Sequence, residues 1–383
     1  MLAGFHLFSF LKSSKESPRK YSIAFFDNFQ YINDTLRIIR IVILFLLWYN
    51  KLLICNTSWT LHKNHSIYEG ANNMILMCKN QEVYDIERQI MINKDLAPGI
   101  LKDNPTHSIF RQWCQSRYSS QTNVTARLMQ GRIFGQGNRQ EINRVTRSLS
   151  LSDCYWLKSP NDNVEFEEVS PYFNDFWTGA GVYKGQSVPT LYTDGMLPKY
   201  WDNCEWLVKQ SSDIEYHCYM LCTALELEVA EVRIVDNKHI AVKNFTSPNI
   251  MFEAADISGR VDVADVTQFD VIEVFGAKGL SMLILDAIVG NIDRHTGNYG
   301  FLRNANSGQY IQMAPLFDFD HALGELPEDD YFLIKTLYKT LSKLGHLDIA
   351  VGFAERVVKQ DTLYQFVNRA EYLLNYWLKS PRL

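Results

Sequence analysis

Residues 290–300 read GNIDRHTGNYG, and they follow a strongly apolar segment, GLSMLILDAIVG at 279–290, that predicts a helix. Asp293 and Asn298 stand five residues apart in this short stretch, which its glycines mark as a loop. A strand pair is expected next, and it leads into Asp318 within the sequence MAPLFDFDHAL. Two carboxylates and one amide therefore come directly after predicted core elements.

A second group of polar residues lies upstream, on a predicted strand and the helix after it. The sequence EWLVK predicts a short apolar strand that ends in Lys209. Ser212 or Asp213 can cap a helix that begins near Ile214, which places Glu215 in its first turn. A lysine and a carboxylate are thus expected on consecutive elements.

The rest of the chain mixes strand-like and helix-like segments, and this predicts an α+β fold. We expect a strand at 74–86, mostly helix over 105–147, an irregular packed segment over 149–185, a polar loop over 186–200, a strand pair around the turn at 236–237, a largely helical pattern from 246, a strand pair around 300–317, and helix over 350–378.

Length and composition limit the class of protein. A chain of 383 residues suggests two or three structural units. With 38 Lys+Arg and 43 Asp+Glu the net charge is −5, so a broad basic face is not expected and direct nucleic-acid binding is not predicted. The seven cysteines are scattered without a C-x-x-C pair, which indicates reduced buried thiols and a cytoplasmic location.

The N-terminal 73 residues carry no recognisable chemistry, but 36–54 reads LRIIRIVILFLLWYNKLLI. Its uncharged apolar run, Ile41 to Trp48, is eight residues long, whereas a membrane span needs about 20. Three interpretations stay open: a short membrane tether through 36–54, a helix packed on the domain, and a segment foreign to the natural protein.

The order of the polar residues matches the needs of phosphoryl transfer. A fixed ammonium group is needed at nucleotide phosphates, and a partner carboxylate keeps it oriented and charged. Mg²⁺ prefers oxygen ligands and retains waters, so one Asp and one Asn suffice. A further Asp accepts or orients the proton of the attacking hydroxyl. Protein kinases divide the work in this way, and the Asp293–Asn298 interval equals that of their catalytic loop D-x-x-x-x-N.

Each residue alone has a simpler interpretation. Lys209 could be a solvated strand end, and Glu215 a charge that complements the helix dipole. Arg294 and His295 could be a structural pair. The order and contexts of the whole set favour the nucleotide site.

These motifs resemble those of the HipA-type serine/threonine kinases. NIDRHTGN is similar to the family's D-R-H-x-x-N catalytic loop, and MAPLFDFDHAL to its A-P-L-[YF]-D metal-binding segment. WLVKQSSDIEYHCYMLCTAL resembles its lysine-bearing strand and the helix with an early Glu, and HIAVKNF the strand entering the hinge. LSLSDCYWLK and FNDFW resemble the N-terminal portion of shorter bacterial members. The resemblance covers about residues 74–330 in patches and is densest over 286–323.

The resemblance implies a two-lobed protein-kinase-like fold of the α+β class, with a small mixed N-lobe and a mostly helical C-lobe, that binds ATP and Mg²⁺. It divides the chain into an N-terminal extension (1–73), an N-terminal HipA-like segment (74–185), a nucleotide-binding N-lobe (186–245) and a helical catalytic C-lobe (246–383).

By position, the resemblance makes Asp293 the catalytic residue and Asn298 and Asp318 the metal ligands. Lys209 corresponds to the phosphate-contacting lysine, and Glu215 to its partner.

Further nucleotide contacts follow from the same resemblance. The segment LYTDGMLPKYW stands where the family has its phosphate loop, with Thr193 and Gly195 at the expected turn. Lys243 and Phe245 belong to the segment entering the hinge. The metal motif reads D-F-D, so Asp320 is a rival ligand, although its neighbour His321 offers that carboxylate a local partner.

The function implied is an ATP- and Mg²⁺-dependent phosphotransferase that phosphorylates Ser or Thr of an unidentified protein and of its own chain, as a toxin or regulatory kinase. A small DNA-binding antitoxin is the expected partner. Two alternatives stay open. The missing glycine-rich loop would suit a pseudokinase or kinase-fold binding module. A lipid or small-molecule kinase is the other, because phosphatidylinositol kinases share a similar loop.

Overall fold

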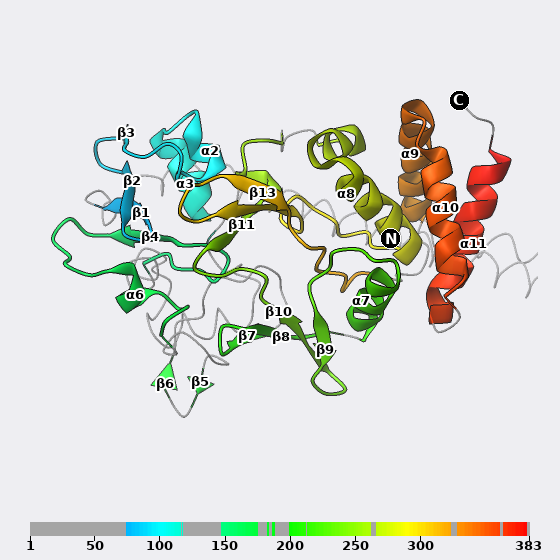
Figure 1. Ribbon diagram of the computed structural model, residues 1–383, viewed down its shortest axis with the longest axis horizontal. Helices are drawn as coiled ribbons and strands as arrows, with labels where there is room; N and C mark the ends of the chain where they lie inside the picture. Colours follow the sequence, from blue (N-terminus) through cyan, green and yellow to red (C-terminus); the bar gives the residue numbers. More distant parts are fainter. Residues whose placement is uncertain are drawn as a thin grey trace, which may run out of the picture. The chain divides into compact units, whose positions relative to one another are not determined.

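The computed structural model describes residues 74–115, 117, 147–174, 182–183, 186–187, 199–211, 213–261, 266–322, 328–360 and 363–380. The chain divides into two compact units, Met1–Glu69 and Gly70–Leu383, and every described residue lies in the second. This part combines antiparallel sheets with helices (Figure 1), so the predicted α+β class is confirmed.

The described strands form four antiparallel sheets, with orders β3-β2-β1-β4, β7-β8-β10-β9, β11-β12-β13 and β5-β6. Their bounds are β1 Ile75–Cys78, β2 Gln81–Asp85, β3 Ile90–Met91, β4 Tyr155–Lys158, β5 Val182–Tyr183, β6 Gln186–Ser187, β7 Lys199–Asp202, β8 Trp206–Gln210, β9 Val232–Ile234, β10 His239–Lys243, β11 Ile250–Ala254, β12 Gly300–Asn304 and β13 Tyr310–Met313.

Along the described part of the chain, the helices before α9 lie between strands, and α9, α10 and α11 come after the last strand. Their bounds are α2 Gly99–Lys102, α3 His107–Gln115, α6 Phe166–Val169, α7 Ile214–Ala224, the 3₁₀ helix η3 Ala255–Ile257, α8 Gln268–Val289, α9 Glu328–Leu344, α10 Leu347–Val358 and α11 Tyr364–Lys379.

Two expectations for the N-terminal segment are wrong in detail. Residues 74–86 form a hairpin and not one strand, because Lys79 adopts a left-handed conformation (φ 50°) that turns the chain between β1 and β2. The segment 149–185 is not irregular throughout, since its YWLK stretch is β4 and pairs with β1. β1 and β4 both contribute to one buried hydrophobic cluster, in which Trp113 and Trp156 are fully buried.

The expectation of a largely helical pattern from residue 246 is also wrong at its start. β11 precedes the helices, and its residues alternate between the buried and part-buried positions of a strand. It pairs antiparallel with β12 over its whole length, from Ile250 with Asn304 to Ala254 with Gly300. The predicted strand pairs around 236–237 and 300–317 are confirmed as β9–β10 and β12–β13.

Helix α8 delivers the chain to the polar loop. Thr267 and Asp270 form a capping box at its start, and Gly276, with φ 59°, interrupts it before the predicted apolar half. Gly290 ends the helix with φ 68°, and a Cβ there would lie 2.7 Å from the guanidinium of Arg369. Glycine at 290 therefore lets the chain turn out of the helix beside a neighbouring side chain.

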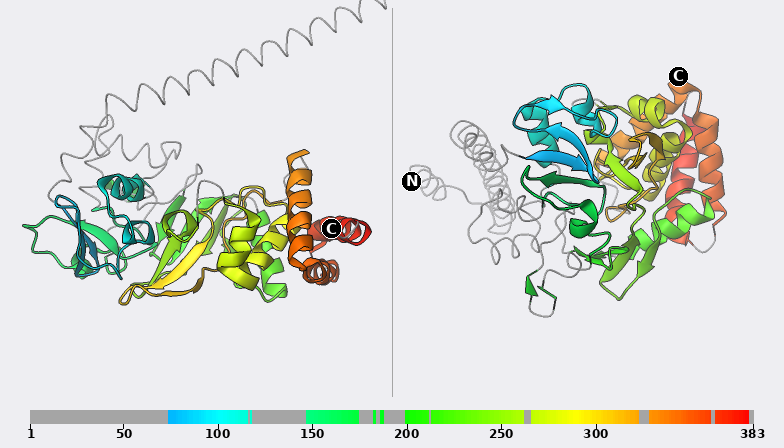
Figure 2. Two further views of the ribbon diagram at one scale, coloured as in Figure 1. Left: turned by 90° about the horizontal axis from the view of Figure 1, so that it is seen from above. Right: turned by 60° about the vertical axis from the view of Figure 1, so that its left-hand side comes forward.

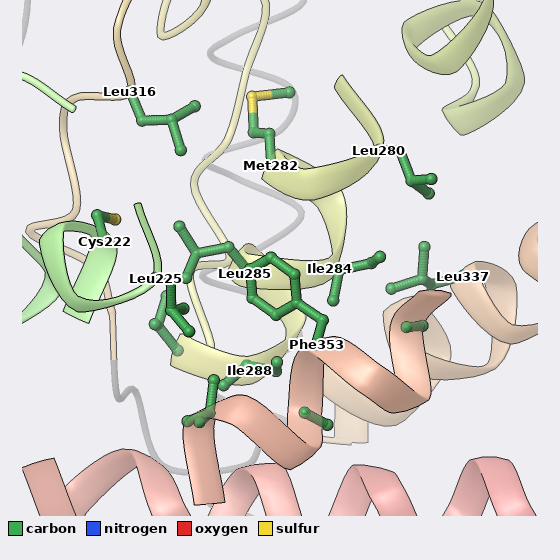
Figure 3. Packing of buried hydrophobic residues seen from close by; sticks show 14 of the residues in the cluster. Cys222, Leu225, Leu280, Met282, Ile284, Leu285, Ile288, Leu316, Leu337 and Phe353 are labelled. Atoms are coloured by element: carbon green, nitrogen blue, oxygen red, sulfur yellow. The ribbon is translucent and has the colours of Figure 1, made fainter. Parts of the chain in front are cut away.

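The main hydrophobic core joins α7 and α8 to the C-terminal helices. Helices α9, α10 and α11 lie side by side (Figure 2), which confirms the helix predicted over 350–378. Figure 3 shows Leu225, which directly follows α7, meeting Leu285 and Ile288 of α8 and Phe353 of α10 in this core. The packing fixes α8, and hence the position of the loop that follows it.

None of the helices in the described part combines the length and the apolarity of a membrane span. The segment 36–54 lies outside the described residues. Five cysteines in the described part are buried thiols: Cys78, Cys114, Cys154, Cys218 and Cys222.

Candidate active site

A cavity of about 220 Å³ collects most of the predicted polar residues. The inner face of the β7-β8-β10-β9 sheet contributes Leu207 and Lys209, and α7 contributes Glu215. Asn298 and Asp318 reach it from the segments on either side of β12 and β13. Residues separated by more than a hundred positions in the sequence therefore share one cavity.

Lys209 lies between two carboxylates. Its Nζ is 2.8 Å from Oε2 of Glu215 and 2.6 Å from Oδ1 of Asp318. Glu215 belongs to the buried face of α7, together with Cys218 and Cys222, and is 1% exposed. The predicted contact between Lys209 and Glu215 is therefore present, and Lys209 is not the solvated strand end of the simpler interpretation.

The electrostatics of this group follow from its burial and its charges. Burial alone lowers the pKa of Lys209, but the carboxylates of Glu215 and Asp318 outweigh it and raise that pKa above its ordinary value. Burial likewise raises the pKa of Asp318, yet Lys209 outweighs it, and the net pKa falls to about 2. The ammonium and the Asp318 carboxylate are thus charged at neutral pH.

The loop after α8 is held by its own backbone and side chains. Asn298 Nδ2 donates a hydrogen bond to the carbonyl oxygen of Asp293, 3.1 Å away, and so closes the five-residue interval. The Asp293 side chain is 51% exposed and is not among the residues that line the cavity. The structure therefore places the Asp293 side chain outside the cavity lining and open to solvent.

Arg294 supports this loop, and it does not form the structural pair with His295 that the simpler interpretation allowed. Its Nε and one terminal nitrogen each lie 3.0 Å from an oxygen of Asp286 on α8, and the other terminal nitrogen donates to the carbonyl of Phe317 at 2.6 Å. His295 instead accepts a hydrogen bond from the backbone of Gly297. A bidentate carboxylate outcompetes a neighbouring imidazole for a guanidinium.

Asp318 is held in an unusual backbone conformation. Its φ is 61°, in the left-handed region that non-glycine residues rarely adopt. The Arg294 bond to Phe317 and a bond from Asn291 Nδ2 to the carbonyl of Asp318, at 3.5 Å, hold the backbone on both sides of its Cα. The surrounding contacts therefore fix a strained residue in the cavity wall.

The donor set of the cavity fits Mg²⁺. Asp318 supplies an ionised carboxylate. The amide nitrogen of Asn298 is bonded to the loop, and this leaves its Oδ1 as the atom that could ligate a cation. Both residues line the cavity, which has room for the waters that Mg²⁺ retains. Within the described residues no group of three or more His, Cys, Asp and Glu side chains forms a protein-only metal cage.

Two other predicted residues line the same cavity. Lys243 lies there with its Nζ 3.4 Å from Glu231, and Phe245 packs against Phe252 and Phe317 with ring centroids 5.6 and 5.5 Å apart. These rings give the cavity an apolar side. Thr193 and Gly195 fall outside the described residues.

Sequence reasoning missed two parts of the cavity wall. Lys199 on β7 is the register partner of Lys209 on β8, and it also lowers the pKa of Asp318. Lys199 could have been found from the sequence, because it is a lysine within LYTDGMLPKYW, the segment predicted to hold the phosphate loop. Ser150 and Asp153 line the cavity from the stretch LSLSDCYWLK, to which the resemblance gave no role in the site.

Comparison with known proteins finds one matching family and one similar kinase. Residues 189–343 match the HipA-like C-terminal domain family, a range that contains all the predicted site residues. The serine/threonine-protein kinase CtkA of Helicobacter pylori strain J99 is 26% identical over 228 residues, which is 53% of this chain and 67% of that protein. The predicted resemblance to the HipA-type kinases is thereby confirmed.

Two solved structures are also similar. The Helicobacter pylori proinflammatory kinase CtkA covers 48% of this chain and 89% of its own, with 19% identity and a TM-score of 0.32. HipA of Shewanella oneidensis, solved with HipB and operator DNA, covers 79% of this chain and 96% of its own, with 13% identity and a TM-score of 0.46.

Proposed function

We propose that this chain, with its HipA-like domain at 189–343, is an ATP- and Mg²⁺-dependent protein serine/threonine kinase. The single observation that carries the proposal is the meeting of Lys209, Glu215, Asn298 and Asp318 at one cavity. Chance placement of the four side chains would not reproduce the kinase order along the chain and their convergence in space.

The proposed fold has two lobes around this cavity. The β7-β8-β10-β9 sheet and α7 form the N-lobe, within 186–245, and the helices from α8 onward form most of the C-lobe, within 246–383. Phe245 lies at the hinge between them. The segment 74–185 supports the cavity from a third side through Ser150 and Asp153.

Each residue has a defined task in the proposed reaction. Lys209, oriented by Glu215, binds the phosphates of ATP, and Thr193 and Gly195 contribute the phosphate loop. Asn298 and Asp318 hold Mg²⁺, which when bound neutralises charge on the phosphates. Lys243 and Phe245 contact the nucleoside from the hinge side.

Asp293 accepts the proton of the acceptor hydroxyl as its oxygen attacks. Its half-exposed side chain suits an acceptor that arrives from solvent as part of another protein. The acceptor is a Ser or Thr of an unidentified protein and of this chain itself, for which Ser187, Thr190 and Thr193 are the candidates. The family resemblance also leads us to propose a small DNA-binding antitoxin as partner.

The direct test uses Asp293→Asn in the full chain. Phosphate transfer from γ-labelled ATP to the chain and to casein should fall by about 10²- to 10⁴-fold, because a general base is lost. ATP binding, measured by calorimetry with Mg²⁺, should stay close to that of the wild type. Transfer at the wild-type rate in this variant would reject the assignment. Nucleotide binding by a wild-type chain that transfers no phosphate would favour the pseudokinase.

A further inference from the structure

His321 is a titratable side chain of the active site for which the proposed reaction has no task. It lies in the turn after Asp318, where the backbone N–H of Ala322 donates to the carbonyl of Phe319 at 3.0 Å. Phe319 and Ala322 are buried, 1% and 8% exposed, so the turn is anchored at both ends. The backbone of His321 is therefore held in place between these anchors, whereas its side chain is 54% exposed.

That place is beside the proposed base. His321 Nε2 lies 3.7 Å from Oδ2 of Asp293 and 3.9 Å from Oδ1 of Asp320. Sequence reasoning foresaw the neighbour Asp320, but only the fold brings the ring to Asp293, twenty-eight positions away in the chain. The side chains of His321 and Asp293 are both half-exposed, so small rotations can bring Nε2 and Oδ2 from 3.7 Å to hydrogen-bonding distance.

Other charged groups nearby are already engaged. Arg294 points away from Asp293 to Asp286, and Nδ1 of His295 accepts from the backbone of Gly297. The backbone carbonyl of Asp293 is bonded by Asn298, but that bond leaves its carboxylate unconstrained. Among the described side chains, His321 is the cation-capable group placed to hold the carboxylate.

We propose that His321 is the positioning residue of Asp293. Its Nε2–H donates to Oδ2 of Asp293 and so turns Oδ1 toward the acceptor hydroxyl. Oδ1 of Asp320 lies 3.9 Å from the same Nε2 and helps to keep that nitrogen between the two carboxylates. The inference rests on the proposed kinase function, and it adds a contact between the catalytic loop and the turn after the metal ligand.

The test compares four full-length variants with the wild type, with labelled ATP, Mg²⁺ and casein as acceptor. His321→Ala should lower kcat about tenfold with an unchanged KM for ATP, because one hydrogen bond to a charged group is lost. His321→Gln, whose amide nitrogen reaches the same place as Nε2, should retain more than half of the wild-type kcat. In the background of Asp293→Asn, His321→Ala should cause no further loss.

His239→Ala is the matched control, since His239 is a similarly exposed histidine 2.9 Å from a carboxylate, Asp236, on the β9–β10 turn. It should turn over like the wild type. If His321→Ala keeps full kcat while Asp293→Asn is inactive, the inference is wrong and the kinase function stands. Equal losses in the Ala and Gln variants would also overturn it. If the wild type transfers no phosphate, or Asp293→Asn matches it, both proposals fall.

Discussion

Two buried ion networks of this chain differ in how fully their groups are paired. Arg303 is 0% exposed, and all three of its guanidinium nitrogens donate, to Glu253, to the hydroxyl of Tyr155 and to backbone carbonyls that include those of Ala97 and Gly308. Such a group has no capacity left for a ligand. It ties the N-terminal segment to the β11-β12-β13 sheet.

The network of Lys209 is built in the opposite way. One ammonium serves both Glu215 and Asp318, and all three residues line a cavity. Asp318 is also held in a left-handed conformation. A buried charged group whose hydrogen bonds are all made within the protein indicates a structural role. Buried charged groups that share partners and line a cavity indicate a functional site.

The largest expected effect on stability comes from Arg303→Ala. Removing the guanidinium leaves Glu253 buried and unpaired, which should lower the free energy of unfolding by about 3–5 kcal/mol. Urea denaturation measures this, and phosphate transfer per folded molecule should stay near the wild-type value. If Arg303→Ala is as stable as the wild type, the structural role assigned to the Arg303 network is wrong.

A smaller effect should separate the two aspartates of the D-F-D motif. Asp318→Asn removes one of the few protein oxygens available to Mg²⁺, so transfer should fall by roughly 100-fold and need more Mg²⁺. Asp320→Asn should lose less than about tenfold, because Asp320 acts through His321. Magnesium titrations of both variants decide the matter, and a stronger magnesium defect in Asp320→Asn would reverse the assignment.

The smallest effect concerns acid stability. The pKa of Asp318 is about 2 in the folded chain, below the ordinary 3.8, so its charge stabilises the fold above pH 4 and ceases to do so as the pH falls toward 2. The contribution is about 2 kcal/mol at most. The difference in unfolding free energy between the wild type and Asp318→Asn should therefore shrink between pH 5 and pH 2.5. A difference that stays constant would show that Lys209 does not lower this pKa.

Local patterns predicted much of the site. The Asp293–Asn298 interval, the strand that ends near Lys209 and the helix with Glu215 in its first turn were all visible, because each depends on residues close in sequence. The contact of Lys209 with Glu215 followed from those two elements. The coarse α+β class followed from the same alternation of strands and helices.

Long-range contacts were beyond local patterns. The simpler interpretation paired Arg294 with its neighbour His295, whereas its partner Asp286 lies eight residues back, in the last turn of α8. β11 was taken for helix because five residues are too short a window to show a period. The contribution of Ser150 to the cavity depends on how separate sheets pack, which no spacing records.

The most direct test of the account compares two lysines that form equally short ion pairs. Lys209 and Lys278 each lie 2.8 Å from a glutamate, but the Lys278–Glu228 pair is exposed and lies outside the cavity lining. Mg²⁺- and ATP-dependent phosphate transfer should fall at least about 100-fold in Lys209→Ala, which removes a phosphate-binding charge from an enclosed site. It should change less than about twofold in Lys278→Ala. Equal activity of the two variants would contradict the assignment of this cavity as a kinase active site.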